Sequence, residues 1–131
     1  MKNEKKVDMI TLGLVNNFLF GLVDEMTLTM IRTAFSPLTR DIFDFQCGFC
    51  CGDGQVVLEG QGTLLHSLVF PPLIEQWLIN NRDNTYPGDV IITNDPYVGD
   101  EMGFPGASHL PDIYMLCPVF LGDERAAWSV A

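Results

Sequence analysis

The sequence predicts an α+β fold in which a long N-terminal helix and a shorter helix pack on a mostly antiparallel sheet, as part of a larger fold. Apolar residues recur at helical spacing in residues 7–34 and again in residues 68–81. The remaining apolar runs are short and are separated by glycine-containing turns, which is typical of strands joined in hairpins. A chain of 131 residues has the length of a single domain.

Residues 7–34 give the clearest helical pattern. Apolar side chains fall at steps of four residues, and three more widen the stripe: Ile10, Leu14, Phe18, Leu22, Met26 and Met30, with Val7, Val15 and Leu19. This spacing predicts a helix that packs along one broad face, and Pro37 predicts where it ends. Gly13 and Gly21 each cost about 1 kcal/mol relative to alanine inside a helix, so we expect them to lie against another backbone.

The rest of the chain alternates between short strands, turns and one helix. "DIFDFQCGFCC" and "QVVLEG" predict a hairpin across "GDG", and "GQGTLLHS" predicts a loop that carries His66. Residues 68–81 predict the shorter helix, because Pro71 and Pro72 fall in its first turn, where proline is tolerated. "YPGDVIITND" predicts a turn and a short buried strand, and residues 113–120 pair with "RAAWSVA" across "LGDE".

Composition limits the partners. The charged fraction of 18% is below the average of about 25%, and we expect part of the surface to be covered by an interface. The net charge of −10 disfavours nucleic acid, whose phosphates would be repelled. No apolar run approaches the roughly 20 residues of a membrane span, and no secretory cleavage pattern follows the start, so we expect a cytoplasmic chain without a membrane partner. "AAWSVA" reads as a strand without a following turn, which indicates part of a larger fold; a frayed strand of a complete domain is the alternative.

The four cysteines suggest a zinc site only weakly. Cys47, Cys50 and Cys51 form a C-x-x-C-C cluster, but a zinc ribbon needs a second pair of ligands that Cys117 alone does not supply. On a strand, Cys47 and Cys51 would face one side and Cys50 the other. We therefore expect reduced thiols that act as small apolar residues, with no disulfide framework.

The stretch "NDPYVGDEMGFPGASHLPD" contains the candidate metal ligands. Asp95 follows a predicted strand and is redirected by Pro96, while His109 and Asp112 lie three residues apart in "HLPD". Two oxygen donors and one nitrogen donor suit Mn²⁺, Fe²⁺ or Zn²⁺, and three ligands leave positions for water or a substrate oxygen. The alternative is that Asp95 is a turn acid bonded to its own backbone and His109 an ordinary loop histidine. We expect Asp100 and Glu101 to face solvent.

Several motifs in order along the chain resemble the hydantoinase B family. "TNDPYVGD" and "SHLPDIYMLCPVF" are similar to the family's N-D-P-Y and H-L-P-D stretches. Upstream, "IRTAFSPLTRDIFDFQCGFCCGDGQVVLEG" is similar to its R-x-T-A-x-S-P stretch, D-F-S-C-type strand and D-x-x-G turn, and "LLHSL" to its H-x-x-S-like loop. The family includes B subunits of N-methylhydantoinases, the B half of 5-oxoprolinases, and subunits of acetone and acetophenone carboxylases. By this resemblance, residues 1–131 are a single domain or the N-terminal segment of a B-type subunit.

The resemblance implies an enzyme of several subunits. An A-type partner uses ATP to phosphorylate a carbonyl or enol oxygen of a small carbonyl substrate, and the B-type subunit holds a divalent metal (Mn, Zn or Fe) where the activated compound is hydrolysed or carboxylated. Asp95, His109 and Asp112 match the metal motif, and His66 matches a histidine expected near the pocket as a catalytic residue. No G-x-x-x-x-G-K-[ST] loop occurs, so we expect ATP on the partner and not on this chain.

Two departures from the family pattern leave alternatives open. The loop "YVGDEMGFPGAS" is longer than in typical hydantoinase subunits and could reshape the pocket. The family's later H-H-x-D-V-G-G motif is missing, so we expect either a separate chain that carries the rest of the B-type fold or a polypeptide that has been cut. A noncatalytic assembly subunit with a degenerate metal motif is the second hypothesis. A free-standing zinc protein that uses the cysteines is the third.

Overall fold

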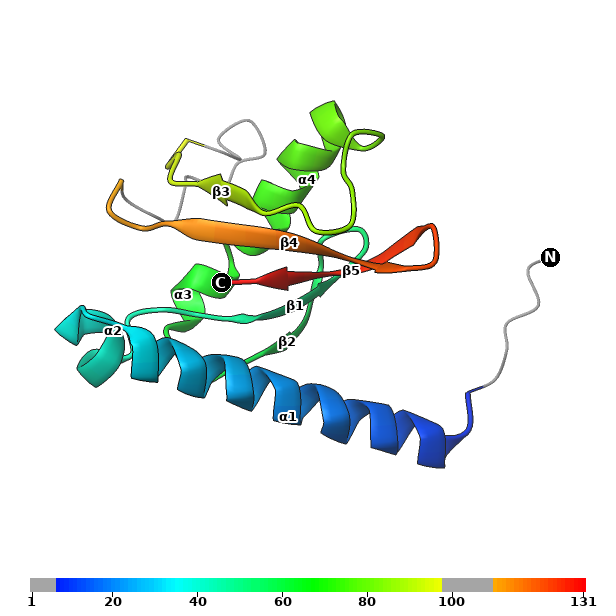
Figure 1. The fold of residues 1–131 in the computed structure, drawn as a ribbon, viewed down its shortest axis with the longest axis horizontal. Helices are drawn as coiled ribbons and strands as arrows, with labels where there is room; N and C mark the ends of the chain where they lie inside the picture. Colours follow the sequence, from blue (N-terminus) through cyan, green and yellow to red (C-terminus); the bar gives the residue numbers. More distant parts are fainter. Residues whose placement is uncertain (1–6, 98–109) are drawn as a thin grey trace.

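The computed structural model describes residues 7–97 and 110–131. They form one sheet with helices on both of its sides (Figure 1). The elements, in order, are α1 Met9–Thr33, α2 Pro37–Ile42, β1 Gly48–Cys51, β2 Val56–Glu59, α3 Leu64–Ser67, α4 Phe70–Asn81, β3 Ile91–Thr93, β4 Tyr114–Leu121 and β5 Glu124–Val130. The five strands form one sheet in the order β2-β1-β5-β4-β3, and all four pairings are antiparallel. The predicted α+β fold is confirmed.

The hydrophobic core lies between α4 and one face of the sheet. Trp128 of β5 is fully buried and stands opposite Cys50 of β1 on one side and Pro118 of β4 on the other. The α4 side of this core is built from buried apolar residues at helical spacing, with Pro71 and Pro72 in the first turn as predicted: Phe70, Leu73, Ile74 and Leu78. Burial of these side chains is the main stabilising contribution to the fold.

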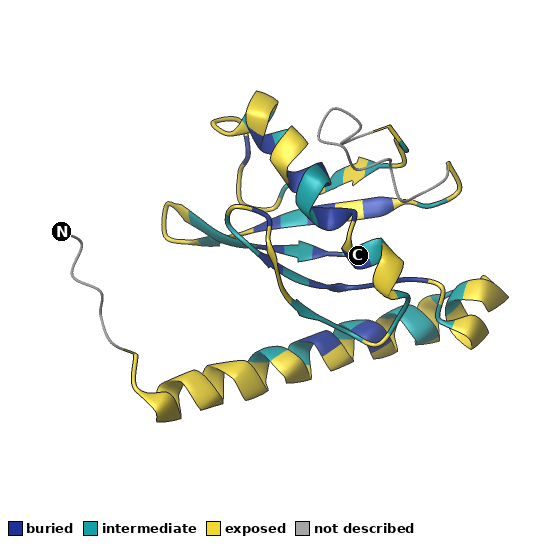
Figure 2. Ribbon diagram, turned by 180° about the vertical axis from the view of Figure 1, so that it is seen from behind, coloured by how far each residue is buried: buried dark blue, intermediate teal, exposed yellow. Residues whose placement is uncertain are grey.

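Helix α1 packs on the sheet only through its second half. Asp8 caps the helix, because its carboxylate accepts hydrogen bonds from the backbone N–H groups of Ile10 and Thr11 at 3.0 and 2.9 Å. Val23 and Thr27 are buried against the β1–β2 hairpin, where Gly60 approaches so closely that a side chain there would collide with Thr27. The first half is exposed along its length (Figure 2).

Two expectations about α1 are therefore wrong within the described residues. The apolar stripe is not buried from end to end, since Ile10, Leu14 and Phe18 are exposed. Gly13 and Gly21 face open space, with no atom within 4 Å of an added Cβ, so this chain supplies no backbone for them to approach. The sequence predicted no membrane span, but α1 has the length and hydropathy of a membrane-crossing helix, and only 6% of its most apolar 18-residue stretch is buried. Core helices of soluble proteins meet the same two criteria.

Three local predictions need correction. Pro37 ends α1 but also starts α2 in its first turn, where Ser36 accepts a hydrogen bond from the Leu38 N–H at 3.2 Å. The stretch that carries His66 is the short helix α3 rather than a loop. Strand β3 is half-exposed rather than buried, because it is the edge strand and Ile92 faces away from α4. Both hairpins are confirmed, with left-handed glycines in their turns at Gly54 and Gly122.

Substitution of Ile74 by alanine tests the core. Ile74 is fully buried, whereas Ile79 on the same helix is 67% exposed. We expect Ile74→Ala to lower the free energy of unfolding by about 2–5 kcal/mol, because it removes buried methyl groups and leaves a cavity. Ile79→Ala should change it by less than about 0.5 kcal/mol. Urea denaturation of both variants measures the difference, and equal effects would contradict the core assignment.

Candidate functional site

A cavity of about 420 Å³ is lined by several polar and titratable side chains. Its wall includes His66 from α3, Asp44 and Gln46 from the segment before β1, and Asp112 and Tyr114 at the start of β4. Apolar side chains make up most of the remainder, among them Met30, Leu38, Phe45, Phe70, Ile113 and Met115. The structure therefore brings together two of the four predicted site residues, His66 and Asp112.

His66 is held in this wall by its neighbours. Its imidazole is 16% exposed, and its Nε2 atom lies 3.9 Å from Oδ1 of Asp44. The Tyr114 ring stands edge-on to the imidazole with centroids 6.3 Å apart, and Tyr114 in turn packs edge-on against Phe70. The next residue on α3, Ser67, donates a hydrogen bond to the Glu59 carboxylate and ties the short helix to β2. An imidazole in this setting can exchange a proton with a group in the cavity.

Asp44 and Gln46 are wall residues that the sequence analysis missed. Gln46 is 2% exposed, and its Oε1 accepts a hydrogen bond from the Cys47 N–H at 3.0 Å, which fixes the amide orientation. Its buried Nε2 has no hydrogen-bond partner among the residues that the structure describes. The available signal was the position of both residues in "DFQC", where alternate residues share a side of an extended segment.

Asp95 lies at the exit of β3 and not on the cavity wall. It is exposed, its Oδ1 accepts a hydrogen bond from the Tyr97 N–H at 2.9 Å, and its own N–H donates to Thr93 Oγ1 at 3.1 Å. This is the geometry of the turn acid that was the alternative to a metal ligand. A carboxylate that accepts one such bond retains other lone pairs, so the turn does not prevent coordination.

A side-chain bond joins the β3 exit to the segment that carries Asp112. Asn94 Nδ2 donates to the backbone carbonyl of Leu110 at 3.0 Å, across the base of the loop. His109, the third predicted ligand, lies outside the described residues, as do Asp100 and Glu101. Within residues 7–97 and 110–131, no group of three His, Cys, Asp or Glu side chains could hold a metal ion. A site of the predicted composition would need His109.

The cysteines behave as expected for reduced thiols. All four are free, and Cys47 and Cys50 are fully buried on opposite faces of the sheet. Cys47 Sγ lies 3.4 Å from Thr27 Oγ1 on α1, whereas Cys50 belongs to the core under α4. Burial is the first cause that raises the pKa of both thiols, and it brings the pKa of Cys50 to about 12. These two cysteines point away from each other, which opposes a shared zinc ion.

Comparison with solved structures defines the class of fold. The chain is similar to the ATP-dependent caprolactamase from Pseudomonas jessenii, with a TM-score of 0.77 and 30% identity over 96% of this chain and 21% of that chain. It is similar in fold to acetone carboxylase in its nucleotide-free structure, with a TM-score of 0.64 and 22% identity over 90% of this chain and 15% of that one. The Hydantoinase B/oxoprolinase family profile matches residues 8–131, and the chain belongs to this family.

Curated relatives agree with this assignment and are much longer. Caprolactamase subunit beta of Pseudomonas jessenii is 32% identical over 125 residues, which cover 95% of this chain and 20% of that protein. 5-Oxoprolinase 1 of Arabidopsis thaliana is 30% identical over 117 residues, which cover 89% of this chain and 9% of that protein. The chain thus spans about a fifth or less of the relatives that it matches.

Thiol alkylation tests the cysteine assignment. A pKa of about 12 leaves roughly one Cys50 thiol in ten thousand as thiolate at pH 8. We expect iodoacetamide to modify Cys50 in the folded chain at least about tenfold more slowly than Cys117, which is half-exposed. Peptide mass spectrometry measures both rates, and urea should bring them together. Equal rates in the folded chain would show that Cys50 is not buried.

Proposed function

We propose that this chain is the metal-binding N-terminal part of a B-type subunit in an ATP-dependent enzyme that hydrolyses a cyclic amide. The observation that carries the proposal is the family match over residues 8–131. One enzyme supports the choice of reaction: the caprolactamase of Pseudomonas jessenii is 30% identical to this chain in its solved structure and 32% identical in its curated beta subunit. Hydantoins, 5-oxoproline and caprolactam share a ring amide, which is the substrate class that we propose.

The proposed complex contains two further components. The caprolactamase relative is named as a subunit, and this chain spans only 20% of it, so the rest of the B-type fold must come from additional polypeptide. An A-type subunit would bind ATP and activate the carbonyl by phosphorylation, since the sequence of this chain contains no phosphate-binding G-x-x-x-x-G-K-[ST] motif. A cytoplasmic location follows from ATP dependence and remains a proposal.

The donor set fits a divalent metal. Asp95 and Asp112 offer carboxylate oxygens, His109 offers an imidazole nitrogen, and these donors suit Mn²⁺, Zn²⁺ or Fe²⁺. The Asn94 bond to Leu110 supports this grouping, because it fastens the residue before Asp95 to the segment that precedes Asp112. When bound, such a metal polarises a substrate oxygen or lowers the pKa of water.

Two cavity residues would supply proton transfer and orientation. His66 would accept a proton from the attacking water or return one to the leaving ring nitrogen. Asp44, whose Oδ1 lies 3.9 Å from Nε2 of His66, would orient the imidazole ring. The largely apolar wall would exclude water from the substrate, which strengthens each electrostatic contact.

Two other functions are supported by separate observations. The acetone carboxylase match favours ketone carboxylation, in which the same site would hold an enolate oxygen, but 22% identity supports only the shared fold. A noncatalytic assembly role is favoured by the exposed first half of α1.

Metal analysis tests the ligand set. In the complex purified through a tag on this chain, we expect Asp112→Asn and His109→Ala to reduce the bound divalent metal at least about tenfold, because the first replaces a charged carboxylate by a neutral amide and the second removes an imidazole donor. Asp123→Asn, which changes an exposed acid in the β4–β5 turn, is the matched control. Retention of the same metal content by both ligand variants would end the metal assignment and favour the assembly role.

Substrate assays test the reaction. With ATP, we expect the complex to consume hydantoin, 5-oxoproline or caprolactam and not to carboxylate acetone with bicarbonate. His66→Ala should lower kcat about 100-fold or more if it transfers protons, with metal content unchanged. Carboxylation without ring opening would replace the proposed reaction with the ketone alternative.

A further inference from the structure

The first half of α1 is uncharged and mostly apolar, with Thr11, Asn16 and Asn17 as its polar residues. No charged residue occurs from Met9 to Val23, and Ile10, Leu14 and Phe18 are 77%, 66% and 67% exposed. A helix that is hydrophobic all round is normally buried, either in the core of a large protein or in a membrane. Asp8 and Asp24 mark the ends of this uncharged part.

A second uncharged surface lies on the face of the sheet opposite α4. Strand pairing places on this side Ile92 opposite Met115, Cys117 opposite Ser129, and Val119 opposite Ala127, with Phe49 and Cys51 next to them on β1. We call these eight residues the open face. None of them is charged, although the chain as a whole carries a net charge of −10. In Figure 1, α4 lies behind the sheet and no described helix lies in front of β4 and β5.

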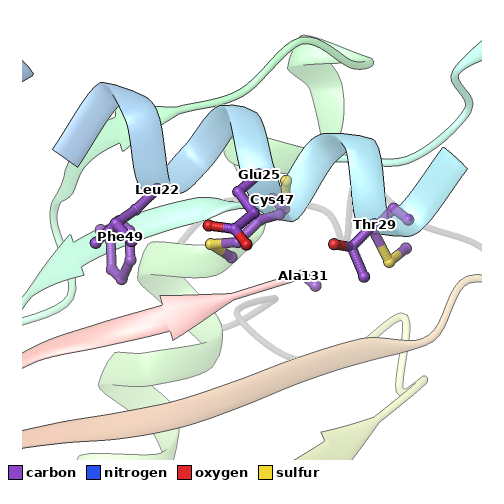
Figure 3. A pocket seen from close by; sticks show the side chains of 8 residues that line it. Leu22, Glu25, Thr29, Cys47, Phe49 and Ala131 are labelled. Carbon is purple, nitrogen blue, oxygen red and sulfur yellow. The ribbon is translucent and has the colours of Figure 1, made fainter. Parts of the chain in front are cut away.

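A groove joins the two surfaces. It has a volume of about 450 Å³, and its walls are Leu22, Met26 and Met30 of α1 with Cys47, Phe49 and Ala131 from the sheet side, together with Glu25 and Thr29. Figure 3 shows α1 above this groove, with Leu22 and Glu25 directed toward Phe49 and Cys47. The exposed half of α1 therefore continues onto the open face through a mostly apolar corner in which Glu25 is the one charged wall residue.

The geometry of α1 does not suit a membrane. The 15 uncharged residues from Met9 to Val23 form about 22 Å of helix, which is shorter than the roughly 30 Å hydrocarbon core. The second half of the helix is fixed on the β1–β2 hairpin through Val23 and Thr27. A membrane would also leave the open face of the sheet uncovered.

The lengths of the relatives indicate what covers the first half of α1 and the open face. In the solved caprolactamase, the matching region is 21% of a chain and superposes with a TM-score of 0.77. The same fold unit therefore lies within a polypeptide about five times longer. The aligned 96% of this chain leaves out about five residues, fewer than the 25 of α1, so most of the helix belongs to the shared fold.

We propose that the first half of α1 and the open face form one continuous interface that binds the remaining four-fifths of the B-type polypeptide through an apolar, uncharged layer. This inference rests on the B-type assignment in the proposed function but not on the reaction. Gly13 and Gly21 fit such a partner, because open space at both positions allows a second backbone to approach the helix closely.

A chimera tests the interface. In it, this chain replaces the matching fifth of Pseudomonas jessenii caprolactamase subunit beta, and the native Cys117 on β4 serves as the reporter. We expect maleimide to label Cys117 at least about tenfold more slowly in the folded chimera than in the 131-residue chain, as measured by peptide mass spectrometry. Leu14→Lys and Val119→Lys should each reduce the yield of soluble chimera about tenfold. Ile79→Lys, at an exposed apolar position on α4, should not.

Several results would overturn the inference. One is a folded chimera in which Cys117 is labelled as fast as in the 131-residue chain. Another is a chimera that fails to fold while the parent subunit folds. A third is a dimer of the 131-residue chain, detected by sedimentation, in which Cys117 is already protected, since the occupant would then be a second copy. Binding of the chain to phospholipid vesicles with protection of the same residues would assign the surface to a membrane. Loss of ring-opening activity with Cys117 still protected would overturn the reaction and leave the interface intact.

Discussion

The pairing of β5 with both β1 and β4 is the contact on which the rest of the structure depends. Residues 124–130 form one strand of the β4–β5 hairpin and pair along their other edge with β1, which joins this hairpin and the β1–β2 hairpin into one sheet. Trp128 occupies the centre of this arrangement, opposite Cys50 and Pro118 and beneath α4. The buried area of one aromatic side chain thus connects the first and second halves of the molecule.

The cavity is a consequence of the same closure. His66 lies on α3 and Asp112 precedes β4, and they share a wall because β1 and β4 both flank β5. The ring of Tyr114 at the start of β4 contacts His66 on α3 and Phe70 on α4, which holds the two sides of the wall together. The chemical groups on the cavity wall are therefore brought together by closure of the sheet and not by the stretch from Asn94 to Asp112 alone.

Local patterns predicted the elements well because their causes are local. Helical spacing, Pro71 and Pro72 in a first turn, and glycines at hairpin turns depend only on near neighbours. The α2 helix was missed because Pro37 both ends one helix and begins another, and the short α3 has too few residues to show a period. The exposure of half of α1 could not be predicted, since apolar spacing reports a preference for burial and not the identity of the covering surface.

The site was predicted in part, and the limit is again physical. The motif resemblance selected His66 and Asp112, which the structure places in one cavity, but it gave no reason to include Asp44 or Gln46. Those two residues reach the wall only through the path of the chain into β1, a tertiary property. Asp95 remains a predicted ligand that does not line the cavity, and its turn geometry follows from its position before a proline.

The order of the strands also has a consequence for how the chain is made. Phe49 pairs with Ser129, which emerges from the ribosome 80 residues later. Until then, β1 and β2 form an isolated hairpin with an unpaired edge, and such hairpins are marginal in water. Non-local pairing of this kind slows folding and prolongs the exposure of unpaired, aggregation-prone strand edges. Nascent chains of this protein therefore expose the outer edge of β1 until residues 124–130 have been made.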